Sequence, residues 1–279
     1  MPELPEVQTT VNGLNRTVRG RKIVNIETTY NSPFYKGKED IKNPEFFKKF
    51  KRKIIGQKIL KAERRAKNIL IHLSGGETIL VHMKMTGHFV YNRPDYPFTR
   101  LDFKLDNGKH LVLSDMRKFA KVTLLNPDHL KDLGPEPLSK NFQFKVFNFQ
   151  LQKRPKGKIK QVLMDQSLIS GIGNIYSDEI LWRAGVHPLS HPNKIPEKNL
   201  RTMFKATKET LKKGIGFGGD SMSDYRNVKG EKGKFQDHHR AYQKHKTRCL
   251  KKGCSGVLKK IRIGGRSAHF CPKHQKLFT

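Results

Sequence analysis

The sequence is poor in acidic residues and contains no long hydrophobic run. Asp and Glu number 24 against 57 Lys and Arg, which gives the 279-residue chain a formal net charge of +33. So large an excess of positive charge predicts a polyanionic partner, with nucleic acid ahead of an anionic membrane surface. No stretch approaches the roughly 18 apolar residues of a membrane-spanning helix, and the N-terminus lacks a signal-peptide layout. We therefore expect a soluble, intracellular protein without a membrane partner.

Cysteine is also scarce, and its three positions all lie in the last 31 residues. This excludes a disulfide framework. Cys249 and Cys254 precede a predicted strand–turn–strand, and Cys271 and His274 follow it, in the pattern C-x4-C-x16-C-x2-H. Two ligand pairs that bracket a hairpin can close a tetrahedral Cys3His zinc site. The alternative is three free thiols and a surface histidine, but the spacing favours one structural Zn²⁺, because four protein ligands leave no position open for catalysis.

The pattern of apolar residues changes along the chain and predicts several domains. Residues 4–14 have helical periodicity, and residues 44–50 form a second short helical pattern. Seven or eight short strand-like runs follow one another up to about residue 125, and the turn sequence DNG (106–108) predicts a hairpin within them. These runs predict a β-sandwich or barrel.

The second half of the chain is predicted to be helical. The expected helices cover residues 140–153, 156–165, 173–185 and 196–214. Residues 216–240 contain too much glycine and charge for a packed element and predict a functional loop. The predicted boundaries are 1–125 for the N-terminal β-sandwich domain, 126–139 for a linker, 140–240 for the helical domain with its loop, and 241–279 for the zinc finger.

The first residues, MPELPEV, place Pro2 beside two acidic residues, Glu3 and Glu6. One interpretation is a helix start, because proline suits the first turn and carboxylates suit the positive end of the helix dipole. The other is chemical, because removal of Met1 would leave a secondary amine flanked by carboxylates. An α-amino group has a pKa of about 8, below about 10.4 for lysine, so part of it is uncharged and nucleophilic at neutral pH.

Eight short motifs follow one another across the chain. They are PELPEV (2–7), RRAK (64–67), HMKMTG (82–87), DMRKFA (115–120), LGPEPL (133–138), GIGNIYSDE (171–179), RAGVHP (183–188) and GRSAHFCPKHQ (265–275). Together they resemble the formamidopyrimidine-DNA glycosylase and endonuclease VIII family of base-excision repair. The resemblance implies an α+β multidomain fold: an N-terminal β-sandwich with flanking helices, a helix–two-turns–helix domain and a C-terminal zinc-finger β-hairpin.

The resemblance also implies a mechanism. Pro2 would attack the sugar C1′ of a damaged nucleotide and form a Schiff base, and β,δ-elimination would follow, so that one site acts as glycosylase and AP lyase. Glu3 would be the acid that assists opening of the sugar ring, with Glu6 as the neighbouring carboxylate, and paired carboxylates can separate their pKa values. Lys67 would contact phosphate and donate a proton during β-elimination. By composition alone Lys67 is one of ten basic residues within 48–67, which also fits a solvated charge.

The implied partner is double-stranded DNA containing oxidised bases, bound by a monomer in the cytoplasm and nucleoid of a bacterial-type cell, without a nucleotide cofactor. Because the damaged nucleotide must leave the stack, side chains have to fill the void. The resemblance assigns Met85 to the void, Arg117 to the opposite base and Phe119 to the neighbouring step, although core packing could also explain Met85 and Phe119. The remaining DNA-binding residues that it implies are His82, Lys118, Lys156, Asn174 and Tyr242, with Arg266 at the hairpin tip holding a phosphate beside the catalytic residues.

The combination of Met85, Arg117 and Phe119 favours an oxidised purine such as 8-oxoguanine or a formamidopyrimidine. Two alternatives stay open: an endonuclease VIII-like glycosylase for oxidised pyrimidines, and a non-catalytic DNA-binding relative. Some residues differ from the family pattern, including Asn68, Arg100 and Ala120, as does the C-x4-C spacing of the first cysteine pair. These differences bear on substrate preference rather than on the chemistry.

Overall fold

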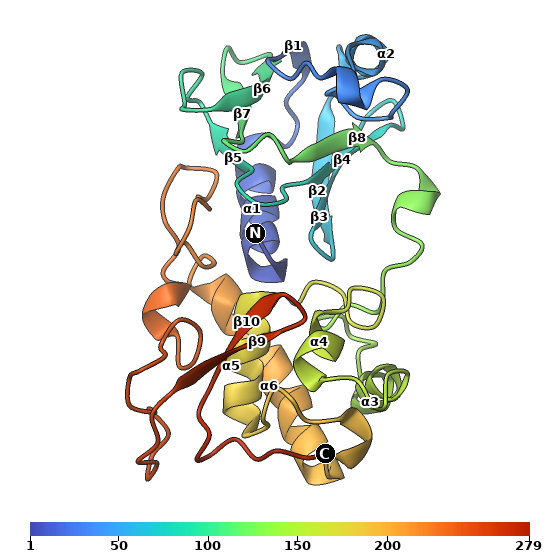
Figure 1. Cartoon of the computed structure of the whole chain (residues 1–279). Coiled ribbons are helices and arrows are strands. Elements are labelled where there is room, and N and C mark those ends of the chain that lie inside the picture. The colour runs from blue at the N-terminus through green and yellow to red at the C-terminus, as the bar shows by residue number, and fades with distance from the viewer. The chain divides into compact units, whose positions relative to one another are not determined.

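The computed structural model describes all residues 1–279 and divides the chain into two compact units. The first unit contains residues 1–131 and 217–234, and the second contains residues 132–216 and 235–279. Figure 1 shows the elements of each unit. No helix combines the length and the hydropathy that crossing a membrane requires.

The first unit contains two four-stranded antiparallel sheets, as the sequence predicts. One sheet has the order β1-β6-β7-β5 and the other β2-β3-β4-β8. The strands are β1 (Ile23–Thr28), β2 (Ile59–Arg65), β3 (Asn68–Leu73), β4 (Thr78–His82), β5 (His88–Tyr91), β6 (Thr99–Leu105), β7 (His110–Ser114) and β8 (Lys121–Leu124). The DNG sequence forms the predicted turn between β6 and β7, with Gly108 at a φ of +70° that suits glycine.

Helix α1 (Leu4–Thr17) packs against the second of these sheets. Its apolar residues form one stripe along the helix, and this stripe is buried, as expected of an amphipathic helix at the surface of a domain. The side chain of Asn15 donates to the Ala62 carbonyl at 2.9 Å and accepts from the Ala62 N–H at 2.7 Å, which fixes the helix to β2. The last turn of α1 is therefore held at a defined place on the sheet.

Helix α2 (Pro44–Ile54) is one turn longer than the sequence pattern indicates. Asn43 caps it by accepting from the Glu45 N–H at 3.2 Å, and Pro44 occupies the first turn. Phe50 and Ile54 are fully buried in the core of the first unit, while the last turn carries three basic residues toward the negative helix end.

The second unit contains the four helices that the sequence predicts and one β-hairpin. The helices are α3 (Phe144–Gln152), α4 (Ile159–Met164), α5 (Asn174–Ala184) and α6 (Glu197–Gly216), and the hairpin strands are β9 (Lys259–Ile263) and β10 (Arg266–Phe270). Helices α5 and α6 lie side by side (Figure 1). They approach closely at Gly214, where a Cβ would meet the Tyr176 hydroxyl oxygen at 2.5 Å.

The segment 217–234 contains no helix or strand, in agreement with the predicted loop, but it packs with the first unit. Its ends meet where the Lys234 N–H donates to the Phe217 carbonyl at 2.8 Å. Val228 packs at Gly13 of α1, and its carbonyl accepts from the Tyr91 N–H of β5 at 2.8 Å. The predicted boundary of 140–240 groups this loop with the helices that precede it, whereas its contacts with α1 and β5 group it with the first compact unit.

Candidate functional site

The three residues at the N-terminus that the sequence predicts to be catalytic are buried at the start of α1. Pro2, Glu3 and Glu6 are all buried, whereas Met1 is exposed. Glu3 is the N-cap residue, and it forms a capping box with Glu6: each side chain accepts from the other residue's backbone N–H, at 2.8 Å for the bond to Glu6 Oε2. Both carboxylates are thus part of the helix start, and they lie within one turn of Pro2.

Glu6 also connects α1 to the loop 217–234. Its second oxygen, Oε1, accepts from the Asp220 N–H at 2.8 Å, and its backbone carbonyl accepts from the Tyr225 hydroxyl at 3.0 Å. Gly219 has a φ of +86°, and a Cβ there would lie 3.0 Å from Glu6 Cγ. The loop therefore needs glycine at this position to approach the glutamate.

Lys67 lies in the tight turn between β2 and β3 and is buried, with only 5% of its surface exposed. Ala66 beside it adopts a left-handed φ of +56°. Arg64 Nε donates to Gln8 Oε1 at 3.0 Å, which ties the end of β2 to the first half of α1. The burial of Lys67 differs from the solvated charge that composition alone suggests.

His82 ends β4 on the neighbouring strand, where it pairs with Asn68 of β3 and Lys121 of β8. Burial lowers the pKa of His82 to about 3, and the nearby positive charges of Lys84 and Lys67 act in the same direction. Its Nδ1 accepts from the Lys84 N–H at 3.0 Å, which leaves the proton on Nε2. In the free protein this imidazole is a neutral donor.

Asp115 organises the two segments that follow. It is fully buried, and its carboxylate accepts from the Thr86 hydroxyl at 2.5 Å, the Tyr30 hydroxyl at 2.8 Å and the Ala120 N–H at 2.7 Å. The Thr86 oxygen in turn accepts from the Arg117 N–H at 3.1 Å. The ends of the exposed loop 116–119 are thereby fixed to the segment that contains Met85.

The loop 116–119 exposes the residues that are predicted to contact DNA. Arg117, Lys118 and Phe119 are all exposed, and Phe119 shows 48% of its surface although it is aromatic. The Arg117 guanidinium lies 4.6 Å from the Phe119 ring centroid, a cation–π contact. Met85 is half-buried. Core packing therefore does not explain Phe119, which the fold presents to solvent.

In the second unit, Asn174 begins α5 and its amide donates to the Ser267 hydroxyl of β10 at 3.4 Å. This contact places the helix start beside the exposed Arg266, which follows the two-glycine turn of the hairpin. Tyr242 is half-buried and packs edge-on against His269 at 5.2 Å. Lys156 is exposed in the segment between α3 and α4. Asn174 thus contacts the residue that follows Arg266 in β10.

Two acidic residues of α5 fix this region in place, although they were not singled out from the sequence. Asp178 accepts from buried Lys160 at 2.5 Å and from both the N–H and the Nδ1 of His269 at 2.9 Å. Glu179 accepts from three successive backbone N–H groups, those of residues 240–242, at 2.8 to 3.0 Å. The pair fixes the hairpin and the entry to the finger on α5. The signal was present in the sequence, because two adjacent acids are rare in so basic a chain.

The four predicted metal ligands form one cluster. Their ligand atoms all lie within 4.8 Å of one another, with Cys254 Sγ 3.6 Å from Cys271 Sγ and Cys249 Sγ 3.2 Å from His274 Nδ1. A tetrahedral site with metal–sulfur bonds of about 2.3 Å needs sulfur–sulfur separations of roughly 3.8 Å. His274 Nε2 lies 2.9 Å from the Trp182 carbonyl, so a proton on Nε2 leaves Nδ1 free to bind. This cluster could hold a metal ion.

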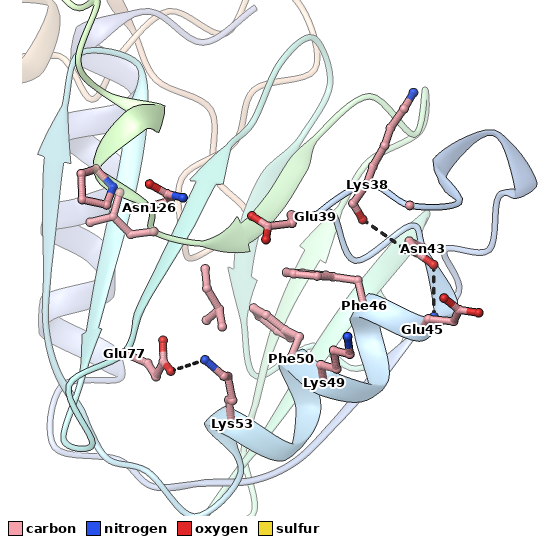
Figure 2. A pocket seen from close by; sticks show the side chains of 14 residues that line it. Lys38, Glu39, Asn43, Glu45, Phe46, Lys49, Phe50, Lys53, Glu77 and Asn126 are labelled. Atoms are coloured by element: carbon pink, nitrogen blue, oxygen red, sulfur yellow. Dashed lines mark hydrogen bonds and ion pairs between the residues drawn. The ribbon is translucent and has the colours of Figure 1, made fainter.

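A cavity of the first unit is not part of this arrangement. It measures about 620 Å³ and lies between α2 and the end of β8. Figure 2 shows its lining, in which Phe46 and Phe50 lie among charged side chains such as Lys53 and Glu77. No residue predicted for catalysis, DNA binding or metal binding lines it.

Comparison with known proteins gives matches along nearly the whole chain. The family model of the formamidopyrimidine-DNA glycosylase N-terminal domain matches residues 1–122, and that of the formamidopyrimidine-DNA glycosylase H2TH domain matches residues 133–226. The chain belongs to the formamidopyrimidine-DNA glycosylase family. The predicted family and its fold are thereby confirmed, as is the expectation of an enzyme that acts on DNA.

Individual formamidopyrimidine-DNA glycosylases agree over their full length. The Streptococcus pneumoniae R6 enzyme is 36% identical over 285 residues, with 99% of each chain covered, and the Lactococcus lactis enzyme is 34% identical over 280 residues, with 98% covered. Two solved structures are also similar, both at 32% identity. The L. lactis glycosylase with abasic-site DNA has a TM-score of 0.86 and covers 98% of this chain and 99% of its own. MutM in complex with DNA containing carbocyclic 8-oxoguanine has a TM-score of 0.84 and covers 99% of this chain and 100% of its own.

Proposed function

We propose that this chain excises oxidised purines from duplex DNA and then cleaves the abasic strand, with the nitrogen of Pro2 as nucleophile. The observation that carries the proposal is the buried Pro2–Glu3–Glu6 start of α1, in a chain that the family model matches from residue 1. Relatives solved with abasic-site DNA and with Fapy-dG-containing DNA support this substrate class.

The reaction begins once Met1 is removed. The Pro2 nitrogen attacks C1′, and the damaged base leaves with the electron pair of the glycosidic bond and takes up the proton that the amine releases. Glu3 donates a proton to the ring oxygen as the sugar opens, which leaves a cationic iminium between Pro2 and C1′. The iminium acidifies the C2′ proton, so its removal expels the 3′ phosphate. A second elimination expels the 5′ phosphate, and water then hydrolyses the Schiff base and frees Pro2.

In this scheme Glu6 is a positioning residue that holds the backbone at Glu3 and at Asp220. Its two carboxylate oxygens each accept a backbone N–H, from Glu3 and from Asp220, which suits an ionised acceptor rather than a proton donor. Lys67 is buried within the same unit, and we assign it the proton transfer and phosphate contact of β-elimination.

The exposed loop 116–119 supports the purine assignment. Phe119 would enter the neighbouring base step, Met85 would fill the void and Arg117 would face the opposite base. His82, Lys118, Lys156, Asn174, Tyr242 and Arg266 would hold phosphates. Asn174 contacts Ser267, the residue next to Arg266, which supports a shared phosphate contact by Asn174 and Arg266.

The metal of the finger is proposed to be one structural Zn²⁺. Three thiolates and one imidazole suit zinc, and they leave no position open for substrate. When bound, zinc would fix the chain around the hairpin that carries Arg266. We place the enzyme with chromosomal DNA in a bacterial cytoplasm, because the similar glycosylases come from bacteria.

Single-turnover excision tests the substrate class. Two duplexes that differ only in the damaged base, 8-oxoguanine or thymine glycol, are offered at equal concentrations, and strand cleavage is followed on a gel. We expect the 8-oxoguanine strand to be cleaved at least tenfold faster. Faster cleavage at thymine glycol would favour the endonuclease VIII-like alternative, and tight binding without cleavage of either would favour a non-catalytic relative.

A further inference from the structure

The second unit contains a basic groove that the proposed reaction does not use. It measures about 490 Å³ and lies between the C-terminal end of α5, one face of α6 and the finger loop 250–252. We call it the α6–finger groove. Its charged lining consists of five basic residues and one acid, Arg183, Lys205, Arg240, Lys251, Lys252 and Glu209.

Most of this positive charge has no ionic partner within the protein. Arg183 lies 3.8 Å from Glu209, but Lys205, Arg240, Lys251 and Lys252 have no carboxylate within ion-pair distance. The charges also act on a neighbour: burial lowers the pKa of Lys213, and the nearby Arg183 and Arg240 lower it further. An anion in the groove would relieve this repulsion.

The walls of the groove are fixed. Glu179 holds the backbone of Arg240 on α5 through its bond to the Arg240 N–H. Lys251 and Lys252 lie in the turn between two metal ligands, Cys249 and Cys254, where the Cys254 N–H donates to the Lys251 carbonyl at 2.9 Å. The four-residue spacing of this cysteine pair thus provides both lysines of the turn.

The groove is separate from the part of the second unit assigned to the lesion-bearing strand. Asn174 begins α5, and Arg183 lies next to its last residue, Ala184. Nine residues at 1.5 Å each separate the two positions by about 14 Å along the helix axis. A phosphate held at Asn174 and one held in the groove would therefore occupy different ends of α5.

A second hollow extends the groove along α6. It shares Thr202 and Lys205 with the groove and adds Lys198 and Arg201, of which Arg201 is paired with Glu197 at 2.8 Å. Lys198 and Lys205 are seven residues apart on one face of the helix, a rise of about 10 Å, or roughly three base-pair steps of 3.4 Å. The only aromatic residue in the lining, Trp182, is 9% exposed, so no stacking surface for single strands is offered.

We propose that the α6–finger groove binds the phosphodiester backbone of a second DNA duplex segment, apart from the segment that contains the lesion. Such a contact would let one molecule hold two stretches of DNA and transfer between them. It requires only phosphates, which agrees with a lining of cations rather than base-reading side chains.

A bridging assay tests this proposal without depending on catalysis. One undamaged short duplex is immobilised, the full-length protein is added, and capture of a second, fluorescent undamaged duplex is measured over a range of salt. The test variant combines Lys205→Gln, Lys251→Gln and Lys252→Gln. The matched control removes the same charge at three exposed lysines outside the groove, Lys140→Gln, Lys145→Gln and Lys194→Gln.

We expect the wild type and the control to capture the second duplex, and the groove variant to capture at least tenfold less with a shallower dependence on salt. Cleavage of a lesion in one short duplex, measured separately, should be unchanged in the groove variant. Equal losses in both variants, or no capture by the wild type, would overturn the proposal. RNA that displaces the second duplex more effectively than DNA of equal phosphate concentration would overturn the assignment to DNA.

Discussion

At the scale of single residues, Glu6 is hydrogen-bonded at both of its carboxylate oxygens. One carboxylate oxygen accepts from the N–H of Glu3, next to Pro2, and the other accepts from the N–H of Asp220 in the loop 217–234. The residue therefore joins the start of α1 to a loop more than 200 positions away. A side chain with only one carbonyl oxygen cannot satisfy both donors.

The Glu6→Gln variant tests this role. An amide in place of the carboxylate leaves one buried N–H without an acceptor, which is worth about 1–3 kcal/mol. We expect the protein to fold, excision of 8-oxoguanine to fall at least tenfold, and amide exchange to increase in residues 217–234. Glu45→Gln on α2 serves as the control, because this glutamate is exposed. Unchanged exchange in the loop would contradict the positioning role.

His82 makes the stability of the protein depend on pH. Its pKa is lowered to about 3 in the folded chain, whereas an unfolded histidine titrates near 6.5. Between these values the unfolded state binds more protons, so the free energy of unfolding decreases as the pH falls below about 6.5.

We therefore expect His82→Asn to reduce this dependence. Urea unfolding between pH 4.5 and 7.5 should show a slope that is shallower than in the wild type by up to about 1 kcal/mol per pH unit. The difference between the two proteins is the informative quantity, because burial also lowers the pKa of His88 and of His187. Parallel slopes would mean that His82 titrates normally in the folded protein.

At the scale of elements, the hairpin β9–β10 depends on two supports. Asp178 and Glu179 hold it and its entry to α5, and the Cys3His cluster holds its outer ends. The strands have only five residues each, so the hairpin has little core of its own. The position of Arg266 at its turn thus depends on both supports.

Removal of the metal should eliminate one of these two supports and leave the bonds of Asp178 and Glu179 in place. We expect one zinc per chain by elemental analysis, and a chelator that removes it should increase amide exchange in residues 249–275 while the β-sandwich stays protected. DNA binding should weaken strongly because Arg266 loses its fixed place. Re-addition of Zn²⁺ should restore it. A chelated protein with unchanged exchange in the finger would show that the cluster is not a metal site.

At the scale of the whole molecule, local patterns predicted the elements, and long-range contacts determined how the site is assembled. The stripe of α1, the DNG turn and the spacing of the cysteine cluster are patterns within single short segments of the chain, and the structure contains all three as expected. The bond from Asp220 to Glu6 spans 214 positions, and the pairing of Asp178 with His269 spans 91. No local pattern specifies such contacts, and for that reason the sequence did not indicate that the loop 217–234 packs on α1 and β5.

The central claim is that the N-terminal proline is the nucleophile of a lesion-specific enzyme. Borohydride trapping tests it most directly: the protein is incubated with an 8-oxoguanine:cytosine duplex and reductant, and the cross-linked peptide is sequenced by mass spectrometry. We predict a covalent adduct on Pro2 in a chain that has lost Met1. An adduct on a lysine such as Lys67, or a working enzyme that retains Met1, would contradict the claim.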